Sequence, residues 1–135
     1  MEAITTAVGR LSPLDSQFIV MHMTHSGSEF QAEVASQGDS KTPIVLVREG
    51  PHRIVSWAAT HGWRSMQTIE GFTIDSHRRR GLARVAAAML VASGAVNPLL
   101  SVAVFAPYCV EIARSVGCRD VRLYERRGED WVQNS

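Results

Sequence analysis

Short apolar runs rich in β-branched residues occupy the middle of the chain. The run 43–47 and the run 53–60 are separated by the turn signal Glu49-Gly50-Pro51-His52. This arrangement predicts a hairpin of two antiparallel strands. The segment 66–74 predicts a third strand of the same sheet, with its side chains alternating between two faces. One face carries Ile69, Gly71 and Thr73, and the other carries Glu70, Phe72 and Ile74.

Two helices are predicted in the second half of the chain. The segment 82–92 is rich in alanine and apolar almost all round, so we expect it to be buried on several sides. Residues 99–105 form a continuous apolar run, the pattern of a strand covered on both faces. The segment 108–116 predicts the second helix, which Gly117 ends as a C-terminal cap.

The C-terminal residues predict two more strands. Residues 121–125 form one strand, Arg127-Gly128 signals a turn, and Trp131-Val132 fits a last short strand. The strand–helix–strand unit in the middle of the chain should be a right-handed crossover with parallel strands. Together with the hairpin, this unit predicts a mixed α/β fold whose central mixed sheet is flanked by helices.

The first forty residues predict a helix followed by a loop. Ser12 can cap the helix, Pro13 suits its first position, and Asp15 faces the positive end of its dipole. We expect this helix to run through about Met23. Residues 26–40 are polar, with one short helical piece at about 30–34. We expect a mobile loop there, of the kind that acts as a substrate lid.

Length and charge limit the class of protein. The chain has 135 residues, which fits a single domain spanning 1–135, and 45% of them are hydrophobic. The net charge of +1 gives no long-range field for a polyanion, so we expect no nucleic-acid partner. Ser93-Gly94 and Asn97-Pro98 interrupt the apolar region 85–106, so we expect no membrane span.

The N-terminus and the cysteines indicate a reducing compartment. Met1-Glu2-Ala3-Ile4 lacks the basic start and the apolar run of a signal peptide. Cys109 and Cys118 are too few for a disulfide framework and have no histidine at metal-ligand spacing, so we expect no metal. A cytoplasmic location is the simplest interpretation.

The stretch 73–83 carries the most specific chemical signal. A predicted strand runs into a short turn, which opens the first predicted helix with the pattern Arg78-x-x-Gly81-x-Ala83. Backbone N–H groups in the first turn of a helix lack internal partners, and the helix dipole favours negative charge there. Gly81 permits a backbone path that a Cβ would obstruct. The pattern predicts an anion site, and a solvated basic turn is the alternative interpretation.

The segment 44–125 resembles the GNAT N-acetyltransferase superfamily. The acetyl-CoA loop of that family reads Gln or Arg, x, x, Gly, x, Gly or Ala, which Arg78, Gly81 and Ala83 match. The order of strands and helices is also similar. The resemblance implies a GNAT-like fold in which two parallel strands splay and open a wedge for the cofactor. The first forty residues match the family only as a helix followed by a loop.

The resemblance also implies how acetyl-CoA binds. Backbone amides of about 79–84 would bind the pyrophosphate, and the strand edge at 72–74 would bond the pantetheine amides like an added strand. The thioester carbonyl would lie near the Thr73 amide. The cofactor-binding residues identified in this way are Phe72, Thr73, Ile74, Arg78, Arg79, Arg80, Gly81, Leu82, Ala83 and Arg84.

Direct attack of an amine on the thioester is the usual chemistry of the family, and it requires a base. Glu70 is the first candidate, because it is a carboxylate on the strand that leads to the cofactor. A surface carboxylate paired with a neighbouring strand is the alternative interpretation of Glu70. His61 and His77 are further candidates, although His77 beside the loop can simply be solvated.

The acid that protonates the leaving thiolate departs from the family pattern. Many members have a tyrosine four residues before the helix-ending glycine, where this chain has Ala113. Tyr108 is the nearest replacement in the sequence, and packing of the first helical turn is its alternative role. Trp57 and Trp63 have the pattern of core and rim aromatics, and substrate platforms are the alternative interpretation.

These features favour an acetyl-CoA-dependent N-acetyltransferase that modifies a primary amine on a small molecule, a peptide or a protein. A binding protein that keeps the acyl-CoA site without catalysis is the alternative, which Ala113 supports. Nucleic-acid binding through 78–80 is a third hypothesis, but the low net charge argues against it. Many members of the family are dimers, so a homodimer is a further expectation.

Overall fold

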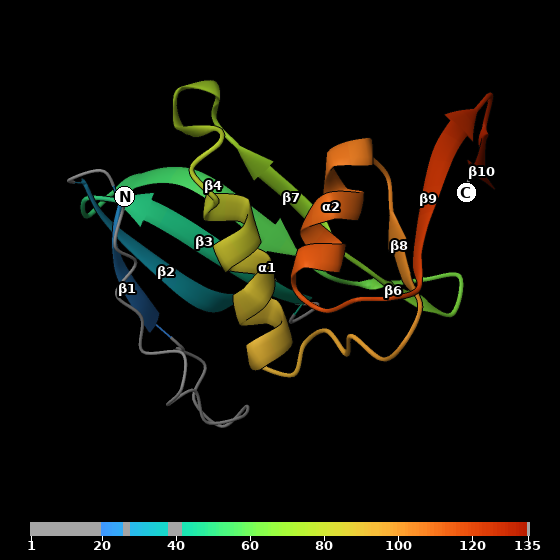
Figure 1. Ribbon diagram of the computed structural model, residues 1–135, viewed down its shortest axis with the longest axis horizontal. Coiled ribbons are helices and arrows are strands. Elements are labelled where there is room, and N and C mark those ends of the chain that lie inside the picture. Colours follow the sequence, from blue (N-terminus) through green and yellow to red (C-terminus); the bar gives the residue numbers. More distant parts are fainter. Residues whose placement is uncertain (1–19, 26–27, 38–41, 135) are drawn as a thin grey trace.

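The structure of the protein, a computed structural model, describes residues 20–25, 28–37 and 42–134. These residues contain two five-stranded sheets and two α-helices, so the predicted mixed α/β class is confirmed. The expected single central mixed sheet is wrong, because the strands form two separate sheets. The two helices lie side by side across the strands, and the second sheet occupies the end that carries the C-terminus (Figure 1).

The first sheet is antiparallel throughout and has the order β1-β2-β3-β4-β7. Its strands are β1 (Val20–His25), β2 (Ser28–Gln37), β3 (Thr42–Glu49), β4 (Arg53–Ala59) and β7 (Glu70–Thr73). The predicted hairpin is confirmed as β3 and β4. Because β7 is last in the order, one of its edges carries no further strand among the described residues.

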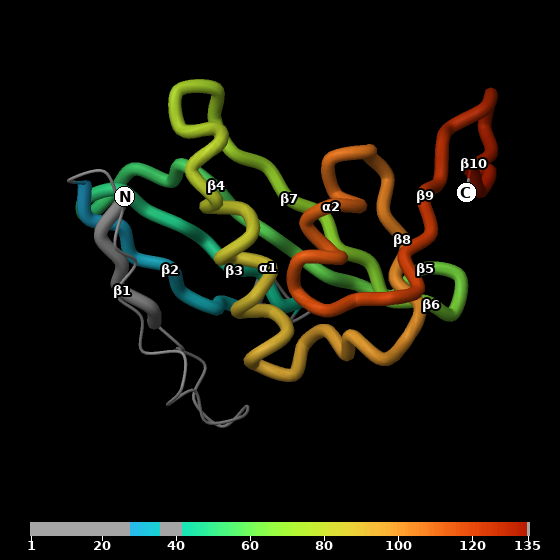
Figure 2. Tube along the Cα trace, viewed as in Figure 1, coloured from blue at the N-terminus to red at the C-terminus, as the bar shows by residue number. Residues whose placement is uncertain are grey.

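The second sheet is mixed and has the order β10-β9-β8-β6-β5. Its strands are β5 (Gly62–Trp63), β6 (Met66–Thr68), β8 (Val102–Val104), β9 (Val121–Arg127) and β10 (Asp130–Gln133). The three central strands run parallel, and each outer pair is antiparallel. The two predicted C-terminal strands are confirmed as β9 and β10. In Figure 2 these strands lie at the end of the molecule opposite to β2.

The N-terminal predictions are wrong wherever the structure describes them. Residues 20–23 belong to β1 rather than to a helix, and the earlier part of that expected helix lies outside the described residues. The expected loop and lid at 26–40 is largely β2, which pairs with β1 on one edge and β3 on the other. Apolar Phe30, Ala32 and Val34 alternate there with polar residues, and the first two are buried. This period of two is the pattern of a half-buried strand.

The segment 66–74 is not the single strand that was predicted. Its first part, β6, pairs in parallel with β8, whereas its second part, β7, pairs antiparallel with β4. Ile69 lies between them, is 1% exposed, and donates its N–H to the Ala103 carbonyl at 3.2 Å. The chain therefore crosses from one sheet to the other at Ile69. The predicted parallel pairing is confirmed for β6 and β8 alone.

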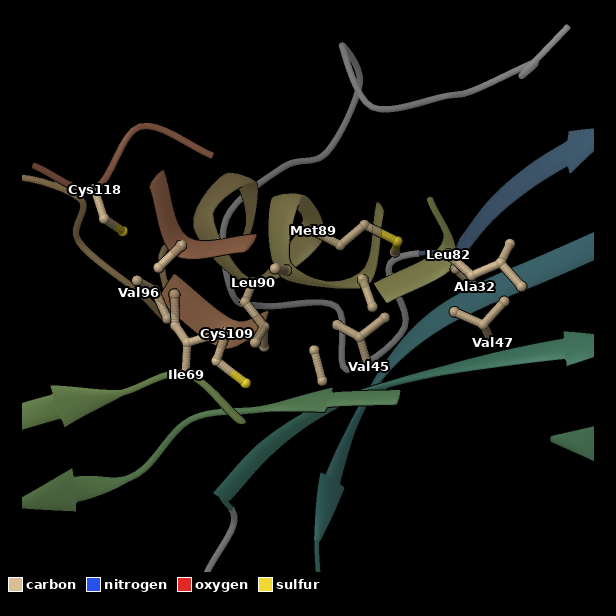
Figure 3. Close-up of a cluster of buried hydrophobic side chains, with 14 of the residues drawn as sticks. Ala32, Val45, Val47, Ile69, Leu82, Met89, Leu90, Val96, Cys109 and Cys118 are labelled. Carbon is tan, nitrogen blue, oxygen red and sulfur yellow. The ribbon is translucent and has the colours of Figure 1, made fainter. Parts of the chain in front are cut away.

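Both helices predicted in the second half of the chain are confirmed, and they bury the core against the sheets. The helix α1 (Leu82–Ala92) packs against β2, β3, β4 and β7. The helix α2 (Pro107–Ser115) packs against α1, β8 and β9, and Gly117 follows it with φ +102°. Side chains from both helices and the strands meet in one apolar cluster (Figure 3). Within the described ranges, neither helix has both the length and the apolar character of a membrane-spanning helix.

The strand that was expected over 99–105 is shorter in the structure. Only β8 is strand, and its three residues are buried, as expected for a strand covered on both faces. Asn97 turns the chain before it, because its side-chain oxygen accepts the Leu99 amide at 3.0 Å and its carbonyl accepts the Leu100 amide at 3.1 Å. Leu99 and Leu100 consequently remain exposed.

Candidate functional site

The loop between β7 and α1 contains two residues with a left-handed backbone conformation. One 3₁₀ turn over Asp75–His77 follows β7, and Gly81 is the N-cap of α1. Gly81 has φ +75°, a conformation that strains any residue with a Cβ. Arg79 also has a positive φ of 64°. Non-glycine residues hold such a conformation only where the surroundings determine it, and these sites cluster where ligands bind.

The first turn of α1 presents backbone donors without helical partners. Its first hydrogen bond runs from the Val85 N–H to the Gly81 carbonyl at 3.0 Å. The amides of 82–84 therefore have no acceptor within the helix. No side chain of the described residues caps this helix end, and the first turn contains no acidic residue. An anion is the group that complements both these donors and the helix dipole.

A cavity of about 450 Å³ opens at this helix end, and we call it the basic cavity. It brings together eight of the predicted cofactor-binding residues, namely Phe72, Thr73, Arg78, Arg79, Gly81, Leu82, Ala83 and Arg84. Ile74 and Arg80 are not in its lining. The remaining lining residues are His77, Tyr108, Glu111 and Ile112. Three arginines against one carboxylate give the cavity a positive potential.

The unpaired edge of β7 borders the basic cavity. The Ile74 N–H donates to the Val55 carbonyl of β4 at 3.0 Å. Backbone groups alternate in direction along an antiparallel strand, so those of Gly71 and Thr73 point away from β4. The Thr73 carbonyl accepts a hydrogen bond from Arg78 Nε at 3.2 Å. The Thr73 N–H is thus the donor that β7 turns toward the cavity.

Tyr108 braces the same edge from α2. Its hydroxyl donates a hydrogen bond to the Gly71 carbonyl at 2.7 Å. Burial, and to a smaller extent the Cys109 thiol, raises the pKa of Tyr108, which keeps the phenol protonated. A Cβ at position 71 would lie 3.3 Å from the Trp57 carbonyl oxygen and 4.0 Å from Ala83 Cβ. Glycine therefore lets β7 lie close to the Trp57 carbonyl of β4, whereas the distance to Ala83 in α1 is an ordinary contact.

A second cavity, of about 470 Å³, adjoins the basic cavity at Phe72 and Tyr108, which line both. We call it the aromatic cleft. Its aromatic lining consists of Trp57, Trp63, Phe72, Phe105, Tyr108 and Trp131. Its other side chains include Glu70 and His61, whose Oε1 and Nδ1 atoms lie 3.8 Å apart. The cleft is therefore apolar with one carboxylate in its wall.

The structure places both predicted catalytic residues, Glu70 and Tyr108, in the wall of the aromatic cleft. His61 lies beside Glu70 and shares a hydrogen bond with the Thr68 hydroxyl at 3.1 Å. Ala113 is fully buried in the core and is absent from the lining of both cavities. A side chain at position 113 thus packs against the protein rather than facing either cavity.

The cavity residues that escaped the sequence analysis include Phe105, Glu111 and Trp131. Glu111 lies one helical turn after Tyr108, so the helical period could have placed it on the same face. Phe105 follows β8 and Trp131 belongs to β10. They meet only because β8, β9 and β10 pair in one sheet, and no local pattern specifies that pairing.

The two cysteines have the surroundings of structural residues. Cys109 and Cys118 are buried, unpaired thiols, and desolvation raises the pKa of each. A raised thiol pKa disfavours the nucleophilic thiolate. Across the ranges that the structure describes, no group of three His, Cys, Asp or Glu side chains has a geometry that could hold a metal ion.

His77 anchors the loop between β7 and α1 to the sheet. Its ring is 5% exposed, and Nε2 lies 3.1 Å from Glu49 Oε1 at the end of β3. Nδ1 shares a hydrogen bond with the Ser76 hydroxyl at 2.8 Å, and the ring meets Phe30 edge-on. The pKa of Glu49 is lowered, mainly by the hydrogen bond from His77 and further by the Arg53 charge. His77, expected to be solvated or catalytic, is therefore a buried structural contact.

Comparisons with protein-family models, with curated proteins and with solved structures give no match for this chain.

Glu49→Gln should lower the melting temperature at pH 7, because it removes the carboxylate that holds His77. The folded-state pKa of Glu49 lies below its ordinary value of 4.5. Its stabilisation is therefore present above pH 4.5 and is lost as the pH falls through the folded-state pKa. The melting-temperature difference between the two proteins should shrink from pH 6 to pH 3, as measured by scanning calorimetry.

Glu29→Gln is the matched control, since Glu29 is an exposed carboxylate on the adjacent strand β2. Surface substitutions of this kind change stability little. A Glu49→Gln difference that is constant between pH 6 and pH 3 would contradict the proposed anchor.

Proposed function

We propose that this protein is an acetyl-CoA-dependent N-acetyltransferase of the GNAT type. The single observation that carries the proposal is the basic cavity, in which a helix N-terminus and an unpaired strand edge converge. The first element suits a pyrophosphate, and the second suits the amide-containing arm of a pantetheine. A ligand that joins a pyrophosphate to an amide chain, as acetyl-CoA does, matches both.

The residues of the basic cavity fit acetyl-CoA in two places. The free amides of 82–84 and the side chains of Arg79 and Arg84 supply donors and positive charge for the phosphates. The Thr73 N–H supplies a donor for the thioester carbonyl at the open edge of β7. Arg78 has a different role, since it bonds the Thr73 carbonyl and lies 3.1 Å from the Asp75 carboxylate.

The acceptor amine would enter through the aromatic cleft. Its nitrogen attacks the thioester carbonyl carbon, an N–C bond forms, the C–S bond breaks, and CoA leaves as the thiolate. Glu70 is positioned to take the proton that the ammonium or the attacking amine must lose, directly or through water. Tyr108 lies where the two cavities adjoin and keeps its proton, so it is the candidate donor to the thiolate.

An acyl-CoA-binding protein without catalysis is the second candidate. Two observations favour it: Ala113 cannot donate a proton, and the Tyr108 hydroxyl is already bonded to the Gly71 carbonyl. Turnover of acetyl-CoA with a panel of amines separates the two functions. The acceptor in the first case is a primary amine on a small molecule or on a peptide.

Gly81→Glu should abolish the rise in melting temperature that acetyl-CoA produces. The substitution places bulk and negative charge at the proposed phosphate position. A ligand at one hundred times its dissociation constant stabilises a fold by about 2.7 kcal/mol, a shift of several degrees. Scanning fluorimetry with and without acetyl-CoA measures it.

Gly94→Glu is the matched control. Gly94 follows the other end of α1 with φ +82°, and a Cβ there meets nothing within 4 Å, as at Gly81. Both variants bear similar backbone strain, but only Gly81→Glu should lose the ligand shift. Retention of the shift in Gly81→Glu, or its loss in both variants, would argue against the phosphate site.

Glu70→Gln should lower turnover by about one-hundredfold at pH 7, the low end of the contribution of a general base. The deficit should narrow toward pH 10, because an alkylamine with a pKa of about 10.4 is increasingly deprotonated in solution. Initial rates between pH 6 and pH 10 at saturating acetyl-CoA test this. Glu111→Gln, on the wall of the basic cavity, is the control and should not change the shape of the pH profile. Parallel profiles for Glu70→Gln and the unmodified protein would exclude Glu70 as the base.

Tyr108→Phe should reduce turnover by less than about one-hundredfold. A thiol has a pKa of about 8.5, so a thiolate is a tolerable leaving group near neutral pH without a dedicated acid. The rates should be compared at saturating acetyl-CoA, since loss of the bond to Gly71 can also disturb the edge of β7. A much larger fall in turnover, with acetyl-CoA affinity intact, would show that Tyr108 is an essential acid.

A further inference from the structure

The chain concentrates its aromatic residues in one place. It contains four phenylalanines, three tryptophans and two tyrosines, and six of these residues line the aromatic cleft. All three tryptophans are among the six, although they come from β4, β5 and β10. An aromatic wall that stays open to solvent leaves apolar area unburied, which a ligand can cover.

The rings form a fixed wall. Trp63 meets Phe105 edge-to-face with centroids 5.1 Å apart, and Phe105 meets Trp131 with centroids 5.0 Å apart. Tyr124 is buried and packs against this row, with its ring centroid 4.7 Å from that of Trp63. On the other wall, Phe72 and Trp57 are cross-strand neighbours, and Phe72 is 41% exposed. Preorganised aromatic walls of this kind bind apolar groups at low entropic cost.

The polar chemistry of the cleft selects a single positive charge. Glu70 is its only carboxylate, and neither lysine nor arginine lines it within the described residues. Glu70 and Phe72 are two residues apart on β7, so their side chains share a face. An ammonium group beside Glu70 therefore lies next to aromatic rings, whose faces also attract cations. A second ammonium group on the same ligand has no further carboxylate to pair with.

From these observations we infer that the aromatic cleft binds a small primary amine with one positive charge and an aromatic body. The inference rests on the proposed function, because it identifies the acceptor class of that reaction. The ammonium group pairs with Glu70, and the aromatic body lies against the row Trp63, Phe105 and Trp131. A volume of about 470 Å³ suits one molecule of this size.

Isothermal titration calorimetry without acetyl-CoA tests the inference with three probes. They are 2-phenylethylamine, its neutral counterpart 2-phenylethanol, and butane-1,4-diamine. We expect 2-phenylethylamine to bind at least tenfold more tightly than either of the others. Equal or tighter binding of the alcohol would overturn the role of Glu70. Equal or tighter binding of the diamine would overturn the aromatic preference.

Two substitutions locate the ligand. Trp131→Leu should weaken 2-phenylethylamine binding about tenfold, and Phe72→Leu provides a second test should the first variant not fold. Leu99→Ala, at an exposed residue remote from the cleft lining, should have no effect. Unchanged affinity in a folded Trp131→Leu or Phe72→Leu variant would overturn the assignment of this cleft.

The acetyl-CoA melting shift, measured on the same proteins, separates this inference from the proposed function. Loss of amine selectivity with an intact acetyl-CoA shift overturns the acceptor class and leaves the cofactor site standing. Selective amine binding without any acetyl-CoA shift supports the ligand class of the cleft and overturns the proposed function.

Discussion

The crossing of the chain between the two sheets at Ile69 is the constraint on which the rest of the structure depends. The buried Ile69 donates its amide to Ala103 beside β8, so the preceding residues stay in the second sheet. The following residues pair with β4 in the first sheet instead. Because β7 and β8 thus belong to different sheets, one edge of β7 has no neighbouring strand in the part of the chain that the structure describes. Both cavities lie along this region. The basic cavity lies where this edge of β7 meets the first turn of α1.

An unpaired strand edge exposes backbone groups that other chains can bind, and proteins normally cover it. Here side chains satisfy its carbonyls, since Tyr108 bonds Gly71 and Arg78 bonds Thr73. The Gly71 and Thr73 carbonyls of this edge therefore already accept hydrogen bonds, whereas the Thr73 N–H can donate one to a ligand. This asymmetry favours a ligand with a carbonyl at that point, as the thioester of the proposed co-substrate has.

The sequence predicted the elements with strong local signals, and the elements that depend on distant pairing were missed or misjudged. The helix at 82–92 and the Gly81 turn follow from composition and from backbone chemistry, and both are present. The sequence predicts a loop in place of β2, because the polar residues of this segment obscure the alternation of Phe30, Ala32 and Val34. The aromatic cleft was out of reach of sequence reasoning, because Trp57, Trp63 and Trp131 meet only through the pairing of strands in two sheets.

The hydrogen bond from Tyr108 to the Gly71 carbonyl links cofactor binding to proton donation in the proposed reaction. In the structure its proton is directed at the Gly71 carbonyl, so it cannot at the same time be donated to a thiolate. A pantetheine amide that adds to the edge of β7 supplies an N–H that can bond the same carbonyl. Binding of the arm would then release the phenol without leaving the buried carbonyl unsatisfied, which would otherwise cost about 1–3 kcal/mol. In the proposed reaction, Tyr108 would therefore be able to donate its proton only after the pantetheine arm has taken its place at the Gly71 carbonyl.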